Sequence, residues 1–159
     1  MKYLNLSKML SIIISVAIYA FPFLEIYCFF NPFLRSVGVH IPMFEEGAYF
    51  LRENSWLNFL IFTVIIILTQ SKKLNLSYFV RYNMMQSLII IFMSSLIDTC
   101  GYLFPYFILA EGSIGYPIFN GCCFALLLLI LYCAIFALRG KIPNIPLLTQ
   151  SVRMQLWTE

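Results

Sequence analysis

Residues 119–138 read FNGCCFALLLLILYCAIFAL, and this stretch carries no charged side chain. An α-helix of about twenty apolar residues is long enough to cross the hydrocarbon core of a bilayer. In lipid the backbone must satisfy its own hydrogen bonds, which only a helix or a closed barrel achieves, and a barrel would show alternating segments of about ten residues. Because no such segments are visible, the stretch predicts a transmembrane helix and an all-α integral membrane protein.

Three more apolar stretches precede this one, so we predict four transmembrane helices in one domain covering residues 1–159. The predicted spans lie at about 9–24, 56–70, 78–98 and 119–138. The second is short for a membrane span unless it continues upstream through 45–54.

The segment between the first two predicted spans differs from an ordinary loop. A turn is expected to open at Asn31, which precedes a proline. After Pro42 we predict an interfacial helix at 43–55, because Glu45 and Glu46 would lie in its first turn and suit the positive end of the helix dipole.

The composition of the whole chain agrees with a membrane protein. Of its 159 residues, 62% are hydrophobic and only 11% are charged. A soluble domain is about half apolar and about a quarter charged, and a disordered chain is more polar still, so both classes are excluded. The net charge of +3 is too small to indicate nucleic-acid binding.

The basic residues predict an orientation, since the cytoplasmic loops of membrane proteins are rich in Lys and Arg. With four spans, the N-terminus, the 71–77 loop and the tail at 139–159 share one side of the membrane. That side carries Lys2, Lys8, Lys72, Lys73, Arg81, Arg139, Lys141 and Arg153. The other side carries only Arg35 and Arg52. Both termini are therefore predicted to be cytoplasmic, or stromal in a plastid.

Polar side chains follow one side of the third predicted span. At 100° per residue they share an arc of about 120°, and we call them the polar face: Asn83, Gln86, Ser87, Ser94 and Asp98. Lipid does not tolerate such a face, so it is expected to point into the bundle or toward a hydrated path. Two interpretations stay open, namely hydrogen bonds between helices and the wall of a conduit. Asp98 lies near the end of the span, where headgroup water could solvate it.

The sequence shows no catalytic, cofactor or metal motif. There is no GxSxG, phosphate-binding loop or HExxH pattern. The only histidine, His40, has no second ligand at metal-binding spacing. We therefore expect neither enzyme activity nor a cofactor.

Two stretches resemble a known family. Residues 79–87 (FVRYNMMQS) contain an Arg-aromatic-Asn-x-Met-Gln-small motif at Arg81, Tyr82, Asn83, Met85, Gln86 and Ser87. After the last span, a Gly-basic…Ile-Pro…Met-Gln pattern appears at Gly140, Lys141, Ile145, Pro146, Met154 and Gln155. Together they resemble the Tic twenty-kilodalton family of the chloroplast inner envelope. A Tyr19…Pro22…Glu25 pattern in the first span is also similar to that family.

The resemblance implies a four-helix membrane protein with both termini in the stroma, and a subunit of the protein-import translocon that contributes to its protein-conducting channel. It implies as partners other translocon membrane subunits, a preprotein in transit, lipids and further copies of the chain, with no nucleic acid. Because no transit segment precedes the first span, we expect a plastid-encoded member in the inner envelope, or a cyanobacterial one in the plasma membrane. Two alternatives remain: a structural anchor for soluble partners, and a small-solute transporter.

Overall fold

The computed structural model describes residues 2–71, 76–104, 114–145, 150 and 152, and these residues form helices without a strand. The predicted all-α fold is confirmed. The helices are α1 (Lys2–Ser36), α2 (Pro42–Glu53), α3 (Ser55–Gln70), α4 (Tyr78–Leu103) and α6 (Gly115–Leu138).

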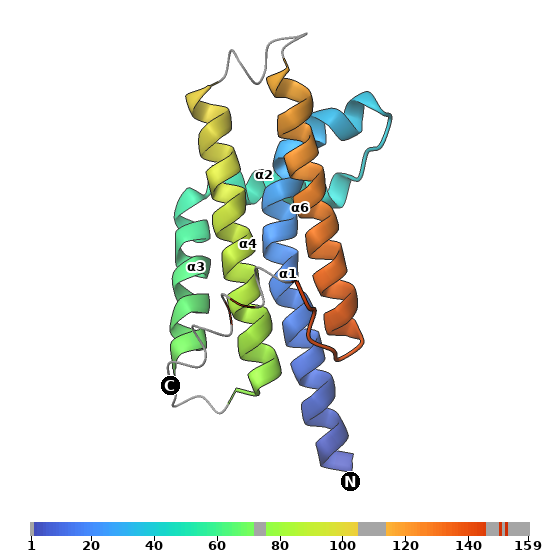
Figure 1. The fold of residues 1–159 in the computed structure, drawn as a ribbon, viewed down its shortest axis with the longest axis vertical. Helices are drawn as coiled ribbons and strands as arrows, with labels where there is room; N and C mark the ends of the chain where they lie inside the picture. The colour runs from blue at the N-terminus through green and yellow to red at the C-terminus, as the bar shows by residue number, and fades with distance from the viewer. Residues whose placement is uncertain (1, 72–75, 105–113, 146–149, 151, 153–159) are drawn as a thin grey trace.

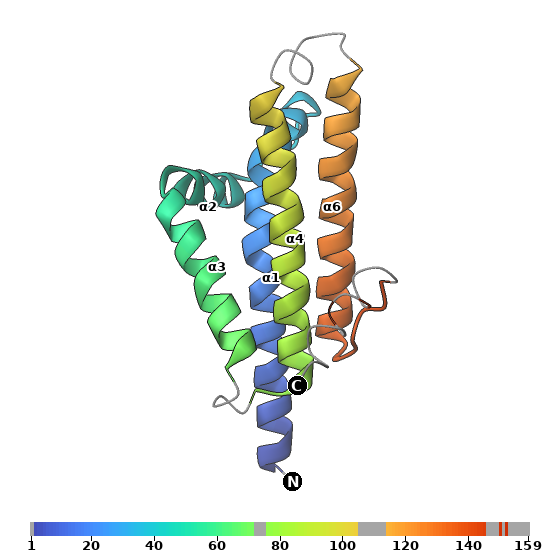
Figure 2. The same ribbon diagram turned by 60° about the vertical axis from the view of Figure 1, so that its left-hand side comes forward.

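Three long helices, α1, α4 and α6, lie side by side along the long axis of the molecule (Figure 1). Helix α1 is the central element, because it packs against α2, α4 and α6. Helix α3 packs on the outside of α4, and α2 crosses the bundle near one end (Figure 2). The start of α1, the start of α4 and the end of α6 lie together at the opposite end, which we call the N-terminal end.

Helix α1 is longer than expected. It passes through Pro22 and Pro32, so the prediction that a loop opens at Asn31 is wrong. A proline inside a helix leaves the carbonyl four residues earlier without its usual donor, but in a membrane a neighbouring helix can replace that donor. The last turns of α1 are held by packing on α6, where the rings of Phe30 and Phe124 lie 6.0 Å apart.

Helices α2 and α3 do not form one straight span. The chain bends by 91° between them, so the second span does not continue upstream as a straight helix. Helix α3 has 16 residues and is therefore about 24 Å long, shorter than a hydrocarbon core of about 30 Å. Within the described residues, α1, α4 and α6 are long and apolar enough to cross a membrane, and the bent pair provides a fourth crossing if it counts as one span.

Two clusters of buried apolar side chains hold the helices together. One joins α1, α4 and α6 and includes Tyr19, Ile90 and Ile130. The other joins α1, α3 and α4 and includes Phe21 and Ile65. The outer faces of the long helices are also apolar, as helices in contact with lipid require.

Candidate functional site

Four of the five members of the polar face of α4 point into the bundle. Asn83, Gln86 and Ser87 have no exposed surface, and Ser94 is 1% exposed. The hydroxyl of Ser94 is enclosed and makes no hydrogen bond within the described residues. Asp98 belongs to α4, but its side chain lies outside the described part of the chain.

A tyrosine of α1 connects two members of this face. The Tyr19 hydroxyl lies 2.9 Å from Oδ1 of Asn83 and 3.2 Å from Oε1 of Gln86, and it donates its single proton to these two acceptors. Nε2 of Gln86 donates in turn to Sγ of Cys133 on α6, 3.4 Å away. Nδ2 of Asn83 donates to the carbonyl oxygen of Phe79 at 2.7 Å. One network therefore joins the three long helices at the middle of the bundle.

Ser87 makes a different contact with α1. Its hydroxyl donates to the carbonyl oxygen of Ile18, 3.3 Å away. In a regular helix that carbonyl would accept from the backbone N–H of residue 22, but Pro22 has none. Ser87 therefore supplies the donor that the proline removes. This explains how α1 carries a proline at membrane depth.

Two partners of the polar face, Tyr19 and Cys133, were not predicted as site residues. In the sequence Tyr19 is only part of a family-like pattern, and Cys133 lies in an apolar run where free cysteine is a small hydrophobe. The signal that could have found Tyr19 is its phenol, since a buried tyrosine hydroxyl in lipid requires an acceptor.

The two segments that carry the family resemblance lie against each other. The Tyr82 hydroxyl, fully buried on α4, donates to the carbonyl oxygen of Pro143 in the tail at 3.3 Å. The tail reaches that point because Gly140 adopts φ +65° and ends α6. Two hydrogen bonds complete this Schellman turn, Gly140 N–H to Ala137 O (2.9 Å) and Lys141 N–H to Phe136 O (3.0 Å).

The remaining motif residues have varied environments. Arg81 donates from Nη2 to the carbonyl oxygen of Ser71 at 3.0 Å, which ties the start of α4 to the end of α3. Met85 and Ile145 are half-buried and Lys141 is exposed. Three further motif residues lie outside the described residues: Pro146, Met154 and Gln155.

A family model described as "Chloroplast import apparatus Tic20-like" matches residues 4–152, nearly the whole chain. The chain belongs to this Tic20-like family. No curated protein and no solved structure is similar enough to count as a match.

Membership of the Tic20-like family makes the chain a component of the chloroplast protein-import apparatus, which acts at the inner envelope. The apolar helices agree with a protein of that membrane. The family is one of translocon components and not a known enzyme family. Among the described residues, no group of three His, Cys, Asp or Glu side chains is placed to hold a metal ion.

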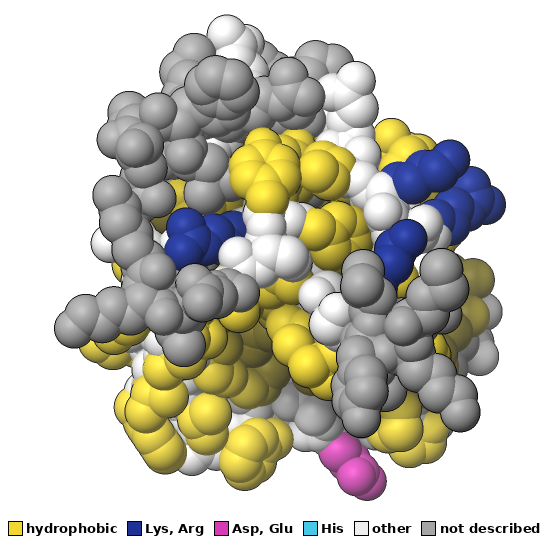
Figure 3. All heavy atoms as spheres, turned by 90° about the horizontal axis from the view of Figure 1, so that it is seen from below, with side chains coloured by type: hydrophobic (Ala, Val, Ile, Leu, Met, Phe, Trp, Pro, Cys, Tyr) yellow, Lys and Arg dark blue, Asp and Glu magenta, His cyan; other side chains and the backbone are white. Residues whose placement is uncertain are grey.

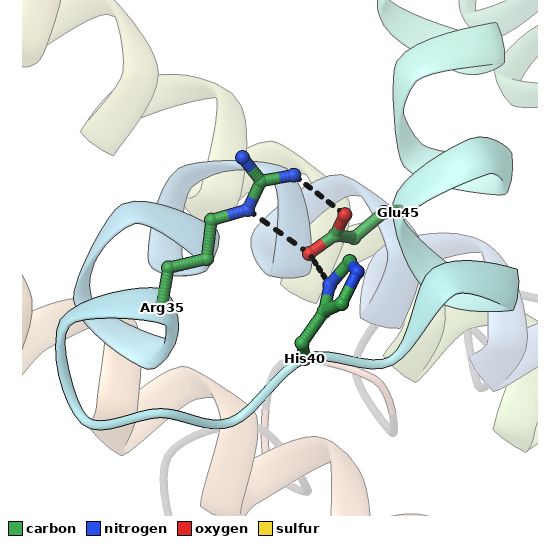
Figure 4. A network of polar contacts seen from close by, with 3 residues as sticks. All are labelled: Arg35, His40 and Glu45. Carbon is green, nitrogen blue, oxygen red and sulfur yellow. Dashed lines mark hydrogen bonds and ion pairs between the residues drawn. The ribbon is translucent and has the colours of Figure 1, made fainter.

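A polar cluster at the α2 end of this Tic20-like chain is a second feature that sequence reasoning missed (Figure 4). Glu45, the N-terminal acid of α2, accepts from Arg35 through two hydrogen bonds of 2.6 and 3.2 Å. Nδ1 of His40 lies 2.7 Å from the same carboxylate. The Arg35 guanidinium, and then His40, lower the pKa of Glu45 to about 2. The cluster clamps the end of α1 to the start of α2 across the intervening turn.

Basic side chains gather at the N-terminal end of the bundle. Figure 3 views this end and shows Lys and Arg side chains on both sides of an apolar centre. The described basic residues here are Lys8, Arg81, Arg139 and Lys141. Three of the described acids, Glu45, Glu46 and Glu53, lie in α2.

Proposed function

We propose that this chain is a structural membrane subunit of the inner-envelope import translocon, and that its packed bundle borders the path of the preprotein instead of enclosing it. The chain then assembles with other membrane subunits or with further copies of itself. A preprotein in transit contacts an outer face of the bundle, and lipid covers the rest.

The observation that carries this proposal is the network around Tyr19 in the middle of the bundle. Its members Asn83, Gln86 and Cys133 have no exposed surface, so the space between α1, α4 and α6 is filled by side chains that bond to one another. An unfolded polypeptide is far wider than such an interface. The polar face therefore serves to fix three helices in register, with each interhelical hydrogen bond contributing about 0.6 kcal/mol.

We further propose that both termini face the stroma and that the chain crosses the membrane four times. The basic side chains at the N-terminal end support this orientation, because basic residues are retained on the side from which a membrane protein inserts. The cluster of Arg35, His40 and Glu45 (Figure 4) then lies with α2 at the intermembrane side, where a helix bent by 91° from α3 can rest in the headgroup region.

The two alternative functions fit the structure unequally. A small-solute transporter needs a wetted passage along the polar face, and the enclosure of Gln86 and Ser94 argues against it. An anchor for soluble partners needs a tail held firmly against the bundle. The contact between Tyr82 and Pro143 supports such a tail, so anchoring is compatible with the proposed role.

Photo-crosslinking during import tests the proposal. A photoreactive residue replaces Gln86 or Ser94 on the polar face, or the exposed Leu96 on the same helix, while a preprotein is arrested in the inner envelope. We expect the two polar-face probes to label only this chain, and Leu96 to label lipid or a neighbouring protein. Transfer of label from both polar-face positions to the preprotein would overturn the proposal.

A further inference from the structure

Three basic residues come together where the start of α1 meets the end of α6. Lys8 lies in the second turn of α1, and Arg139 and Lys141 flank the glycine that ends α6. A Cβ placed on Gly140 would lie 3.5 Å from Cδ1 of Ile12, which is four residues after Lys8. Because residues four apart share one side of a helix, Lys8 lies on the side of α1 that faces the end of α6. We call Lys8, Arg139 and Lys141 the basic cluster.

The charge of the basic cluster is available to a ligand. All three side chains are exposed, and both ion pairs among the described residues belong to Glu45, in α2 at the opposite end of the bundle. The sequence has no Asp or Glu at positions 1–24 or 112–158, the stretches that carry the cluster. The cluster is therefore a concentrated positive charge, and it selects an anion as its partner.

The basic cluster lies at the level where the lipid-facing surface of the helices begins. Met9 and Leu10, directly after Lys8, are 61% and 59% exposed, and Leu138, directly before Arg139, is 60% exposed. In a membrane protein such exposed apolar side chains are in contact with lipid. Basic side chains at the end of a membrane helix extend to the interface, where the phosphate groups of lipids lie. The anion nearest to the cluster is thus a lipid phosphate.

An anionic lipid matches both features of this surface. Its phosphate can approach the three cations, while its acyl chains cover the apolar side chains beside them, including Ile13, which is 60% exposed. An acidic segment of a soluble protein, or free phosphate, would use the charge alone. A zwitterionic lipid brings a positive group together with its phosphate, and the cluster repels that group.

We propose that the basic cluster binds the phosphate headgroup of an anionic membrane lipid, whose acyl chains lie against the exposed apolar side chains of α1 and α6. Such a lipid bridges the first and the last long helix of the bundle. This binding depends neither on where the preprotein passes nor on which end of the bundle faces the stroma.

Native mass spectrometry of the full chain in detergent tests the proposal. The probe is phosphatidylglycerol, and phosphatidylcholine with the same acyl chains is the comparison. We expect phosphatidylglycerol to be retained at least about tenfold more tightly. Lys8→Gln, Arg139→Gln and Lys141→Gln should each weaken its binding about fivefold, the contribution of one basic residue near a lipid headgroup, and should leave phosphatidylcholine unaffected. Two controls should stay within about twofold: Lys8→Arg, which keeps the charge, and Arg52→Gln, in the last turn of α2.

Three results would overturn the proposal. Equal retention of the two lipids by the wild type would remove the preference for an anion. Unchanged retention of phosphatidylglycerol in the variant with all three Gln substitutions would place the lipid elsewhere. Binding of glycerophosphoglycerol or of a hexaglutamate peptide as tightly as the full lipid would mean that the cluster takes a soluble anion or an acidic protein segment. Each variant is checked for an unchanged melting temperature, and the three single variants carry the test if the triple variant fails to fold.

Discussion

The hydroxyl of Ser87 lies 3.3 Å from the carbonyl oxygen of Ile18 and donates to it the hydrogen bond that Pro22 cannot supply. A break in the backbone bonding of one helix is thus repaired by a side chain of another. Through this contact the polar face of α4 stabilises the backbone of α1 at the centre of the bundle.

Ser87→Ala should lower the free energy of unfolding by about 1 kcal/mol, because it leaves a carbonyl in the bundle without a donor. In a Pro22→Ala background the same change should cost less, since residue 22 then has an N–H for Ile18. Equilibrium unfolding in mixed micelles gives this double-mutant cycle, with Ser95→Ala as the exposed control. Equal cost in both backgrounds would refute the link between Ser87 and Pro22.

Tyr19→Phe should destabilise the bundle by about 1 to 2 kcal/mol, because it leaves the acceptors of Asn83 and Gln86 without their shared donor. Tyr132→Phe on α6 is the control, since Tyr132 is 38% exposed. The same unfolding measurement compares them. If both variants were equally stable, the network would not contribute to the packing of the helices.

Tyr82→Phe should release the tail from the bundle while α4 stays folded. The lost hydrogen bond to Pro143 holds the segment that follows α6. Hydrogen exchange at residues 140–145 is expected to become faster in this variant and to stay unchanged in Tyr78→Phe, whose ring is 47% exposed on the same helix. Unchanged exchange in Tyr82→Phe would mean that the tail is held by other contacts.

The contacts of Glu45 with Arg35 and His40 should persist at mildly acidic pH. The pKa of Glu45 in the folded chain is about 2, below the ordinary value of 4.5, so its contribution to stability is fully present above about pH 4.5 and is lost as the pH falls toward 2. Hydrogen exchange of residues 37–45, after correction for intrinsic rates, should therefore rise as the pH falls from about 4.5 toward 2. Glu45→Gln should show the fast exchange already at pH 7, whereas Glu46→Gln should behave as the wild type.

The sequence predicted the class of fold well because lipid imposes a simple requirement on helices. The run at 119–138 could only be a helix, and it lies within α6. The 3.6-residue period also placed Asn83, Gln86, Ser87 and Ser94 on one side of α4, where they are found. That side is polar and the rest of the helix is apolar, so the sequence indicated that it faces away from lipid.

The parts that could not be predicted depend on contacts between distant residues. Helix α1 continues through Pro32 where it packs on α6, and no local pattern reveals that packing. Arg35 and His40 lie ten and five residues before Glu45, and the irregular turn before α2, which no periodic pattern predicts, places both against its carboxylate. The sequence left open whether the polar face bonds to other helices or faces water. Tyr19 answers this in the structure, because it donates to Asn83, more than sixty residues later in the chain.

The central claim is that the polar face is sealed within the bundle, and substituted-cysteine labelling tests it most directly. Ser87→Cys nearly preserves the shape of the side chain, and Arg139→Cys provides an exposed control at the N-terminal end. A water-soluble thiol reagent is applied to inner-envelope vesicles, idle or with an arrested preprotein, and mass spectrometry reads each cysteine separately. We predict complete labelling of Arg139→Cys and none of Ser87→Cys in either state. Labelling of Ser87→Cys that appears when the preprotein is arrested would contradict the account and make this face a wall of the conduit.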